Sequence, residues 1–351
     1  MVTEGNSIVN NSKRIDWIDF AKGLALILVV IGHSVSGYET GSITRGVIFS
    51  FHMPIFFILS CATYRWSTTL QEYLKKLAKA ARHLLIPAAA TYIILIIVDI
   101  IRQPSLFISG DFWHGKLYTF VFTSGVQTNF GVITVNAIGM TWFFLVLFAA
   151  RAIFDYMHLY LSEQLLLIVS IVCGILGIVV GSIYWLPFSL DIALAVMPFM
   201  YFGYKIKTFN PEKHPWVKLL ICLAIWVFVI YLTFPDWRDW TYLELAIRRY
   251  PLFPLCYIGA ICGSMFICEI GVLFCKLGKI AKPLVLFGRY SLYFFCIHIL
   301  DEIWKDLYTI ENHQFLSAGK RLLLDLIAFG IFMVLRFAFK KALAAIRQRK
   351  A

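Results

Sequence analysis

The segment RIDWIDFAKGLALILVVIGHSVSGYETGSITRGVIFSFHMPIFFILSCATY, residues 14–64, decides the fold. It contains two apolar runs, Gly23–Ile31 and Val47–Leu59, which with their flanks are typical of membrane-spanning helices. One histidine accompanies each run: His33 lies two residues after the first run, and His52 lies within the second. An ionisable side chain inside a span is costly, so it usually faces the protein interior or a watery cavity. Both histidines are therefore candidate functional residues.

Lys22 and His33 flank the first run and are eleven residues apart. That spacing is about three helical turns, so both side chains project from one face of the helix, roughly 16 Å apart along its axis. Two simpler interpretations stay open. Lys22 could extend to the lipid headgroups, and His33 could be a polar residue hydrogen-bonded between helices.

His52 is followed by Met53 and Pro54. Proline has no backbone N–H, so the carbonyl of Ser50 loses its helical partner. Within a membrane such a break is tolerated where protein or a water-filled cavity satisfies the freed group. His52 is therefore predicted to line a cavity. The alternative is a proline-kinked helix in which His52 makes an interhelical hydrogen bond.

The composition indicates a polytopic membrane protein. Of the residues, 60% are hydrophobic and only 15% are charged, which excludes the soluble domains that the length alone would suggest. The net charge of +12 does not indicate nucleic acid, because the basic residues collect in alternate loops. The eight cysteines include no CxxC pair, so neither a disulfide framework nor a zinc site is expected, and we expect no metal.

Hydropathy predicts an all-α fold with about ten transmembrane helices. The spans are expected at residues 15–37, 43–64, 84–101, 139–157, 164–182, 187–204, 216–234, 252–275, 285–304 and 321–340. Between them, residues 65–83 have helical periodicity and basic side chains, which predict an amphipathic helix on the membrane surface. Residues 102–138 are expected to form a long loop.

The loops on the side of the N-terminus hold most of the Lys and Arg residues, so both termini are predicted to be cytoplasmic. This orientation places Lys22 near the cytoplasm and His33 in the outer half of the membrane. The domains then follow: a disordered cytoplasmic tail at 1–13, a membrane domain at 14–341 and a basic cytoplasmic tail at 342–351.

The residues of the opening segment resemble the start of the acyltransferase-3 family of integral membrane acyltransferases, in particular its fucose-4-O-acetylase-like subgroup. The family has a basic residue, ten intervening positions and a histidine, which Lys22 and His33 match. Phe51-His52-Met53-Pro54 and Phe56-Phe57 extend the resemblance. Lys22 stands where the family pattern also has arginine, and lysine lacks the bidentate fork of arginine.

The resemblance implies roles for further residues. His33 inherits the catalytic role of the family's first-span histidine. Lys79 and Arg82 resemble a basic-x-x-basic pattern that is linked to coenzyme A, with Lys in place of the first Arg. Thr141-Trp142-Phe143 resembles a span with an aromatic residue near the acyl path, which gives Trp142 a role in donor binding. Gly288–His298 resembles a late Ser-Leu-x-x-Tyr/Phe-x-x-His segment.

The residue chemistry suits acyl transfer. Histidine is the usual general base for a hydroxyl nucleophile, because its ordinary pKa of about 6.5 fits proton transfer near neutral pH. We therefore predict that His33 is the base, with His52 in a second catalytic position. Lys22, Lys79 and Arg82 suit the phosphates of an acyl-CoA donor, although basic clusters also attract anionic lipid headgroups.

Candidate acceptor-binding residues lie late in the chain. His298 and Asp301 are one turn apart and share a helix face. For Asp301, and for Asp191 near the start of a span, we favour simple solvation at the membrane surface. The loop 234–251 supplies Trp237 and Arg248, which could stack on a sugar and bind a lipid pyrophosphate. The alternative for this loop, an aromatic belt at the interface, is favoured.

These observations predict an O-acyltransferase of the bacterial inner membrane. It would move an acyl group, most simply acetyl from cytoplasmic acetyl-CoA, to a hydroxyl of a cell-envelope glycan or a lipid-linked sugar. The expected partners are acyl-CoA, this acceptor and membrane lipid, with no nucleic acid. The alternative is a proton-coupled transporter or a membrane sensor without catalytic activity, since intramembrane His and Asp also suit proton coupling.

Overall fold

The structure is a computed structural model that describes residues 14–35, 40–130, 133–209, 212–234 and 241–350. The first helices are α1 (Asp16–Ser34), α2 (Thr40–Phe49), α3 (His52–Ala62), α4 (Leu70–Arg102), α5 (Gly110–Phe122), α6 (Trp142–Tyr160) and α7 (Glu163–Ile183). The later ones are α8 (Leu190–Ala195), α9 (Met197–Lys205), α10 (Pro215–Thr233), α11 (Leu255–Cys275), α12 (Lys282–Arg289), α13 (Ser291–Leu300), α14 (Lys305–Tyr308) and α15 (Gln314–Lys350).

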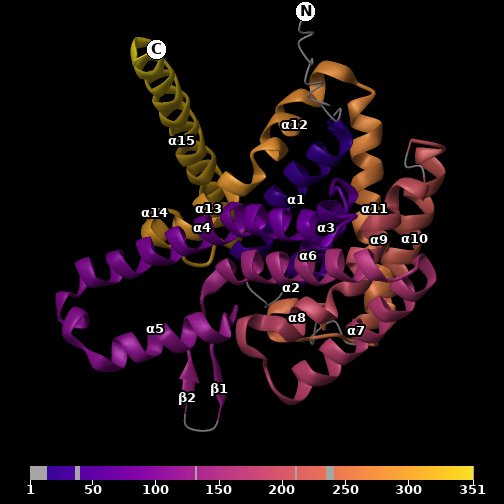
Figure 1. Ribbon diagram of the computed structural model, residues 1–351, viewed down its shortest axis with the longest axis horizontal. Coiled ribbons are helices and arrows are strands. Elements are labelled where there is room, and N and C mark those ends of the chain that lie inside the picture. Colours follow the sequence, from indigo (N-terminus) through magenta and orange to yellow (C-terminus); the bar gives the residue numbers. More distant parts are fainter. Residues whose placement is uncertain (1–13, 36–39, 131–132, 210–211, 235–240, 351) are drawn as a thin grey trace, which may run out of the picture.

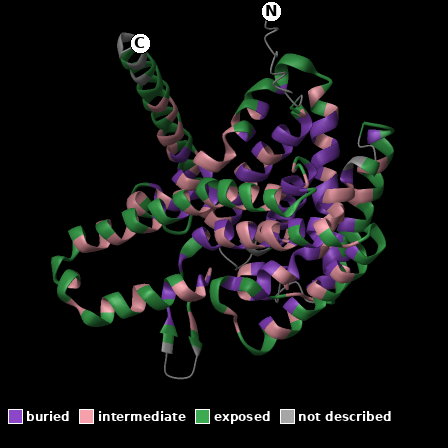
Figure 2. Ribbon diagram, in the orientation of Figure 1, coloured by how far each residue is buried: buried purple, intermediate pink, exposed green. Residues whose placement is uncertain are grey.

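Among the described residues the regular secondary structure is helical apart from one small antiparallel hairpin, in which β1 (Thr128–Phe130) pairs with β2 (Ile133–Val135), and one isolated bridge between Glu244 and Arg249. Most helices gather in one body, from which α4 and α5 extend as an arm and α15 projects (Figure 1). Buried residues concentrate in the body, while the arm and the outer part of α15 are mainly exposed (Figure 2). Exposed apolar side chains on such helices suit contact with lipid.

Within the described residues, eight helical segments are long and apolar enough to cross a membrane. Two bent helix pairs bring the number to ten if each pair forms one span; they are Pro187–Ala195 with Met197–Lys205, bent by 51°, and Gly278–Arg289 with Ser291–Tyr308, bent by 63°. The prediction of an all-α polytopic membrane protein is confirmed. The cytoplasmic placement of both termini stays a prediction.

Helix α1 lies at the centre of the packing, in contact with α3, α11, α12 and α15. Two glycines allow α12 to approach it closely. A Cβ on Gly288 would overlap the backbone carbonyl of Asp19, and a Cβ on Gly23 would lie 2.6 Å from the carbonyl oxygen of Leu284. The small residues therefore place the bend between α12 and α13 directly against the Lys22 end of α1.

The chain breaks between α2 and α3, directly before His52. Phe51 leaves the helical region with φ −141°, and His52 begins α3. Pro54 then falls in the first turn of α3, where a missing N–H costs no helical hydrogen bond. The indole N–H of Trp226 donates to Ser50 Oγ at the break, at 2.8 Å. The predicted interruption beside His52 is confirmed.

Two expectations about the next segment are wrong. The predicted surface helix at 65–83 and the span at 84–101 form one continuous helix, α4, which contains Pro87. The helical periodicity of the basic stretch continues into the apolar run, and a single proline removes only one backbone donor. The expected long loop at 102–138 contains α5 and the β1–β2 hairpin.

Candidate active site

Three histidines from distant parts of the chain converge. The ring of His33, on α1, lies with its centroid 5.9 Å from the ring of His52 on α3 and 6.1 Å from the ring of His298 on α13. His52 and His298 are buried, and His33 is partly exposed. The fold thus brings together the three histidines that were predicted from the sequence to be functional.

A small cavity of about 30 Å³ opens beside two of these histidines. Its lining includes His33 and His52 together with the aromatic residues Phe49, Trp142, Phe143 and Phe295. Trp142 was predicted to lie near the acyl path, and the structure places it in the lining of this histidine cavity. A cavity of this size has room for only a small group.

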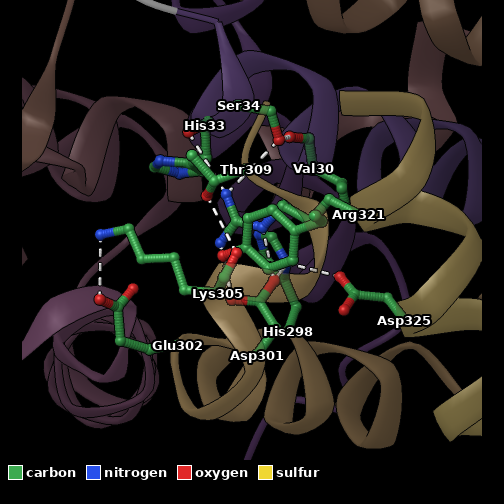
Figure 3. Close-up of polar contacts among 11 residues, drawn as sticks. Val30, His33, Ser34, His298, Asp301, Glu302, Lys305, Thr309, Arg321 and Asp325 are labelled. Carbon is green, nitrogen blue, oxygen red and sulfur yellow. Dashed lines mark hydrogen bonds and ion pairs between the residues drawn. The ribbon is translucent and has the colours of Figure 1, made fainter. Parts of the chain in front are cut away.

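His298 is bound to carboxylates through one ring nitrogen (Figure 3). Its Nδ1 lies 2.9 Å from Asp325 Oδ2, in a hydrogen bond, and 2.9 Å from Asp301 Oδ2. The shared helix face predicted for His298 and Asp301 is confirmed by this contact. All three side chains are buried. Asp325, on α15, was not singled out from the sequence.

Arg321 compensates the charge of Asp301. Its Nε donates to Asp301 Oδ2 at 2.6 Å and its Nη2 to Oδ1 at 2.8 Å, a bidentate pair. Its Nη1 also donates to the backbone carbonyl of His33 at 3.3 Å. The favoured interpretation of Asp301 as a solvated carboxylate is therefore wrong: the side chain is 1% exposed and paired.

The group His298, Asp301 and Asp325 also has the composition of a metal site, since its potential ligand atoms lie within 4.8 Å of one another. However, the guanidinium cation of Arg321 already hydrogen-bonds to both oxygens of Asp301. We therefore interpret the group as a charge network in which the guanidinium supplies the positive charge.

A second, larger cavity of about 660 Å³ lies at the Lys22 end of α1. Its lining is rich in basic side chains: Arg14, Lys22, Arg65, His83, Arg151, Arg289 and Arg336. Asp19 contributes an acidic group and is paired with Arg289 at 3.4 Å. Lys22 therefore faces a site with several cationic neighbours, which suits a polyanionic ligand.

Phe143 and Phe295 line both cavities, and their ring centroids lie 5.3 Å apart. The basic cavity and the histidine cavity therefore meet at these two rings. Because α1 contributes Lys22 to one cavity and His33 to the other, a single helix connects the two sites.

Lys79 and Arg82 lie apart from this arrangement. Both are exposed on α4 and line an open depression of about 870 Å³. Among the residues that the structure describes, only His83 lines both this depression and the large basic cavity. Arg151 was missed, although it lies in a predicted span and its burial in an apolar run is a signal of function. In the described residues its Nε is buried without a hydrogen-bond partner.

Arg248 is buried and engaged by protein groups. It forms a bidentate pair with Asp191, at 2.7 and 3.2 Å, and its guanidinium lies 3.8 Å from the centroid of the Trp185 ring. Asp191, for which solvation was favoured, is fully buried, because this guanidinium compensates it. Trp237 lies outside the described residues, so its predicted role stays a prediction.

Glu244 also lines the histidine cavity, and it was missed because it lies in a loop, outside the apolar runs in which an ionisable residue stands out. Its Oε1 lies 3.5 Å from Arg45 Nη2. Burial raises the pKa of the Glu244 carboxyl, and the charge of Arg45 acts in the opposite direction. The cavity thus contains a carboxyl group as well as two imidazoles.

Comparison with known proteins identifies the family. The sequence profile of the acyltransferase-3 family, an acyltransferase domain, matches residues 15–340. This range covers nearly every described helix, including α1 with Lys22 and His33 and most of α15. Searches of curated proteins and of solved structures gave no match.

Proposed function

This chain belongs to the acyltransferase-3 family of membrane acyltransferases, and on that premise we propose that it acetylates a hydroxyl of a cell-envelope glycan or a lipid-linked sugar. The donor in this proposal is cytoplasmic acetyl-CoA, and the location is the bacterial inner membrane. Family membership favours this activity over transport or sensing without catalysis.

The single observation that supports the proposal best is the pair of neighbouring cavities that share Phe143 and Phe295 in their linings. A thioester donor of the coenzyme A type has a polyanionic head and a long neutral arm that ends in the acyl group. The basic cavity suits the head, and the histidine cavity suits the acyl end. The two meet at Phe143 and Phe295, where the arm would pass.

Donor binding in this proposal relies on the basic lining. Lys22, Arg151 and Arg289 would make charge-assisted hydrogen bonds to phosphate oxygens, and arginine can do so with two parallel N–H groups. Lys79 and Arg82 lie next to this cavity across His83 and would meet only a part of the head that extends out of it.

Chemistry would follow at the histidine cavity. His33 takes the proton of the acceptor hydroxyl as the oxygen attacks the thioester carbonyl, which forms the new C–O bond. The C–S bond then breaks, and the proton passes from His33 to the leaving thiolate, which yields coenzyme A. His52 lines the same cavity, and in this proposal its ring would donate to the oxygen on which negative charge develops.

The size of the histidine cavity favours acetyl among possible acyl groups. A volume of about 30 Å³ beside Trp142, Phe143 and Phe295 leaves little room for a longer chain. For the acceptor, the Glu244 carboxyl and the neighbouring Arg45 offer an acceptor and a donor of hydrogen bonds to sugar hydroxyls.

A transfer assay tests the proposal. Purified protein in lipid vesicles would be incubated with acetyl-CoA labelled in the acetyl group and with separated envelope glycan and lipid-linked sugar fractions. Label in one fraction, with release of an equal amount of free coenzyme A, is the expected result. Label in none of the fractions, without coenzyme A release, would contradict it.

A further inference from the structure

The contacts of His298 suggest a role that reaches beyond its own helix. Resting on the function proposed above, we propose that Asp325 and His298 form a positioning pair that fixes the orientation and tautomer of the base, His33. His33 lines the cavity, whereas the side chain of His298 is 0% exposed and its ring neighbours the ring of His33. His298 and Asp325 are thus positioning residues rather than catalytic ones.

The hydrogen bond to Asp325 determines which nitrogen of His298 is free. A carboxylate only accepts hydrogen bonds, so the Nδ1 that lies 2.9 Å from Asp325 Oδ2 is the one that holds the proton. In a neutral imidazole, Nε2 is then an acceptor. Among the described residues this Nε2 is buried and has no hydrogen-bond partner. A buried acceptor without a partner is costly, so a donor is expected nearby.

His33 is placed to be that donor. The two ring centroids are 6.1 Å apart, so a small rotation brings a ring N–H of His33 into contact with His298 Nε2. The other nitrogen of His33 is then the one with a free lone pair, directed at the cavity and the acceptor hydroxyl. Enzymes commonly activate a hydroxyl nucleophile with a base that is itself hydrogen-bonded to a third, orienting group.

The two carboxylates of the network, Asp301 and Asp325, have different roles in this proposal. Arg321 engages both oxygens of Asp301 and also the backbone carbonyl of His33, so that pair anchors α15 to α1. Asp325 hydrogen-bonds to His298, whereas Asp301, which also lies 2.9 Å from His298 Nδ1, is paired with Arg321. When His33 becomes cationic during transfer, the charge of Asp325 is therefore available to stabilise it through His298.

His298→Asn is the decisive variant, because the Asn amide can still donate to Asp325 in the place of Nδ1–H but has no counterpart of Nε2. Asp325→Asn is the complementary change, since it removes the carboxylate charge that hydrogen-bonds to Nδ1 and leaves only Asp301, which is paired with Arg321, beside that nitrogen. Glu302→Gln, an exposed carboxylate on the same segment as Asp301, is the matched control. Asp325→Glu keeps the acceptor and tests for rescue.

Steady-state transfer is the first measurement. We expect His298→Asn and Asp325→Asn to lower kcat by about 10²-fold or more with KM for acetyl-CoA little changed, since a mispositioned base affects chemistry and not donor binding. Asp325→Glu should recover part of the loss, and Glu302→Gln should behave like wild type. Near-normal kcat in well-folded His298→Asn, or equal loss in Asp325→Glu and Asp325→Asn, would overturn the pair.

Nitrogen NMR of histidine-labelled protein in vesicles tests the pair without any transfer reaction. The proposal predicts an Nδ1–H tautomer for His298 in wild type and a changed His33 signal in His298→Asn. An unchanged His33 signal, or a metal ion that copurifies with wild type and is lost in Asp325→Asn, would refute it. If wild type transfers no acetyl group, the proposed function fails, while the NMR result still decides the pair.

Discussion

The rings of Phe143 and Phe295, with centroids 5.3 Å apart, lie between the basic cavity and the histidine cavity and line both of them. Phe143 comes from α6 and Phe295 from α13, so the boundary between the two cavities depends on the packing of these helices. In the proposed reaction this boundary limits what can reach His33.

Phe295→Ala is therefore predicted to relax the selection of the acyl group. Removing the ring enlarges the space beside His33, and each methylene accommodated in a pocket is worth roughly a 10- to 200-fold difference in rate. We expect the ratio of kcat/KM for butyryl-CoA over acetyl-CoA to rise by about tenfold or more. Phe337→Ala, an exposed position on α15, is the control. An unchanged ratio in a folded Phe295→Ala protein would show that these rings do not select the acyl group.

Donor binding distinguishes the two basic surfaces. Lys22→Gln with Arg151→Gln removes two cations from the large cavity, and Lys79→Gln with Arg82→Gln removes two from the exposed depression. Loss of a charge-assisted hydrogen bond costs about 1.5–3 kcal/mol. We expect the first double variant to raise the Kd for acetyl-CoA by about tenfold or more, as measured by calorimetry, and the second to raise it less. The reverse order would move the donor head to the surface of α4.

The buried pair of Asp191 and Arg248 makes a prediction about stability. Asp191→Ala leaves a buried guanidinium without its counter-charge, which costs roughly 3–5 kcal/mol. Glu302→Ala removes the partner of Lys305 in an exposed pair, which is worth about 1 kcal/mol or less. Thermal unfolding in detergent should show a large drop in Tm for Asp191→Ala and little change for Glu302→Ala. Equal Tm values would mean that the buried pair contributes nothing net.

The distribution of Lys and Arg predicts the topology. If both termini are cytoplasmic, reporter fusions after residues 70, 210, 280 and 345 should all report the cytoplasm, because each of these positions follows an even number of predicted spans. The same orientation puts the basic cavity at Lys22 on the side where acyl-CoA is present. A periplasmic signal at any of the four positions would require the spans to be redrawn.

The sequence predicted the site where an ionisable residue interrupts an apolar run. His33, His52 and His298 were found in this way, and so was the shared face of His298 and Asp301. Arg151 and Asp325 give the same kind of signal, because each lies in a predicted span, but they were not singled out. The pairing of Asp301 with Arg321 was beyond prediction, since no local pattern relates two residues on different helices.

The fold was predicted in class but not in every element. Pro87 suggested a boundary between a surface helix and a span, yet α4 passes through it. Asp191 lies near the start of a predicted span, where solvation is the ordinary expectation, and its burial is explained by the pairing with Arg248. The pairing of charged residues that are far apart in the chain was therefore the main feature that could not be predicted from the sequence.

The central claim is that His33 is the base of an acyl transfer reaction, and its removal tests this claim most directly. Purified His33→Ala and, as control, His114→Ala at an exposed position of α5 would be compared with wild type in the labelled transfer assay, with acetyl-CoA binding measured in parallel. Loss of a general base costs 10²–10⁴-fold, so His33→Ala should bind acetyl-CoA and fail to transfer the label, while His114→Ala behaves like wild type. Transfer by His33→Ala at a rate near that of wild type would contradict the account.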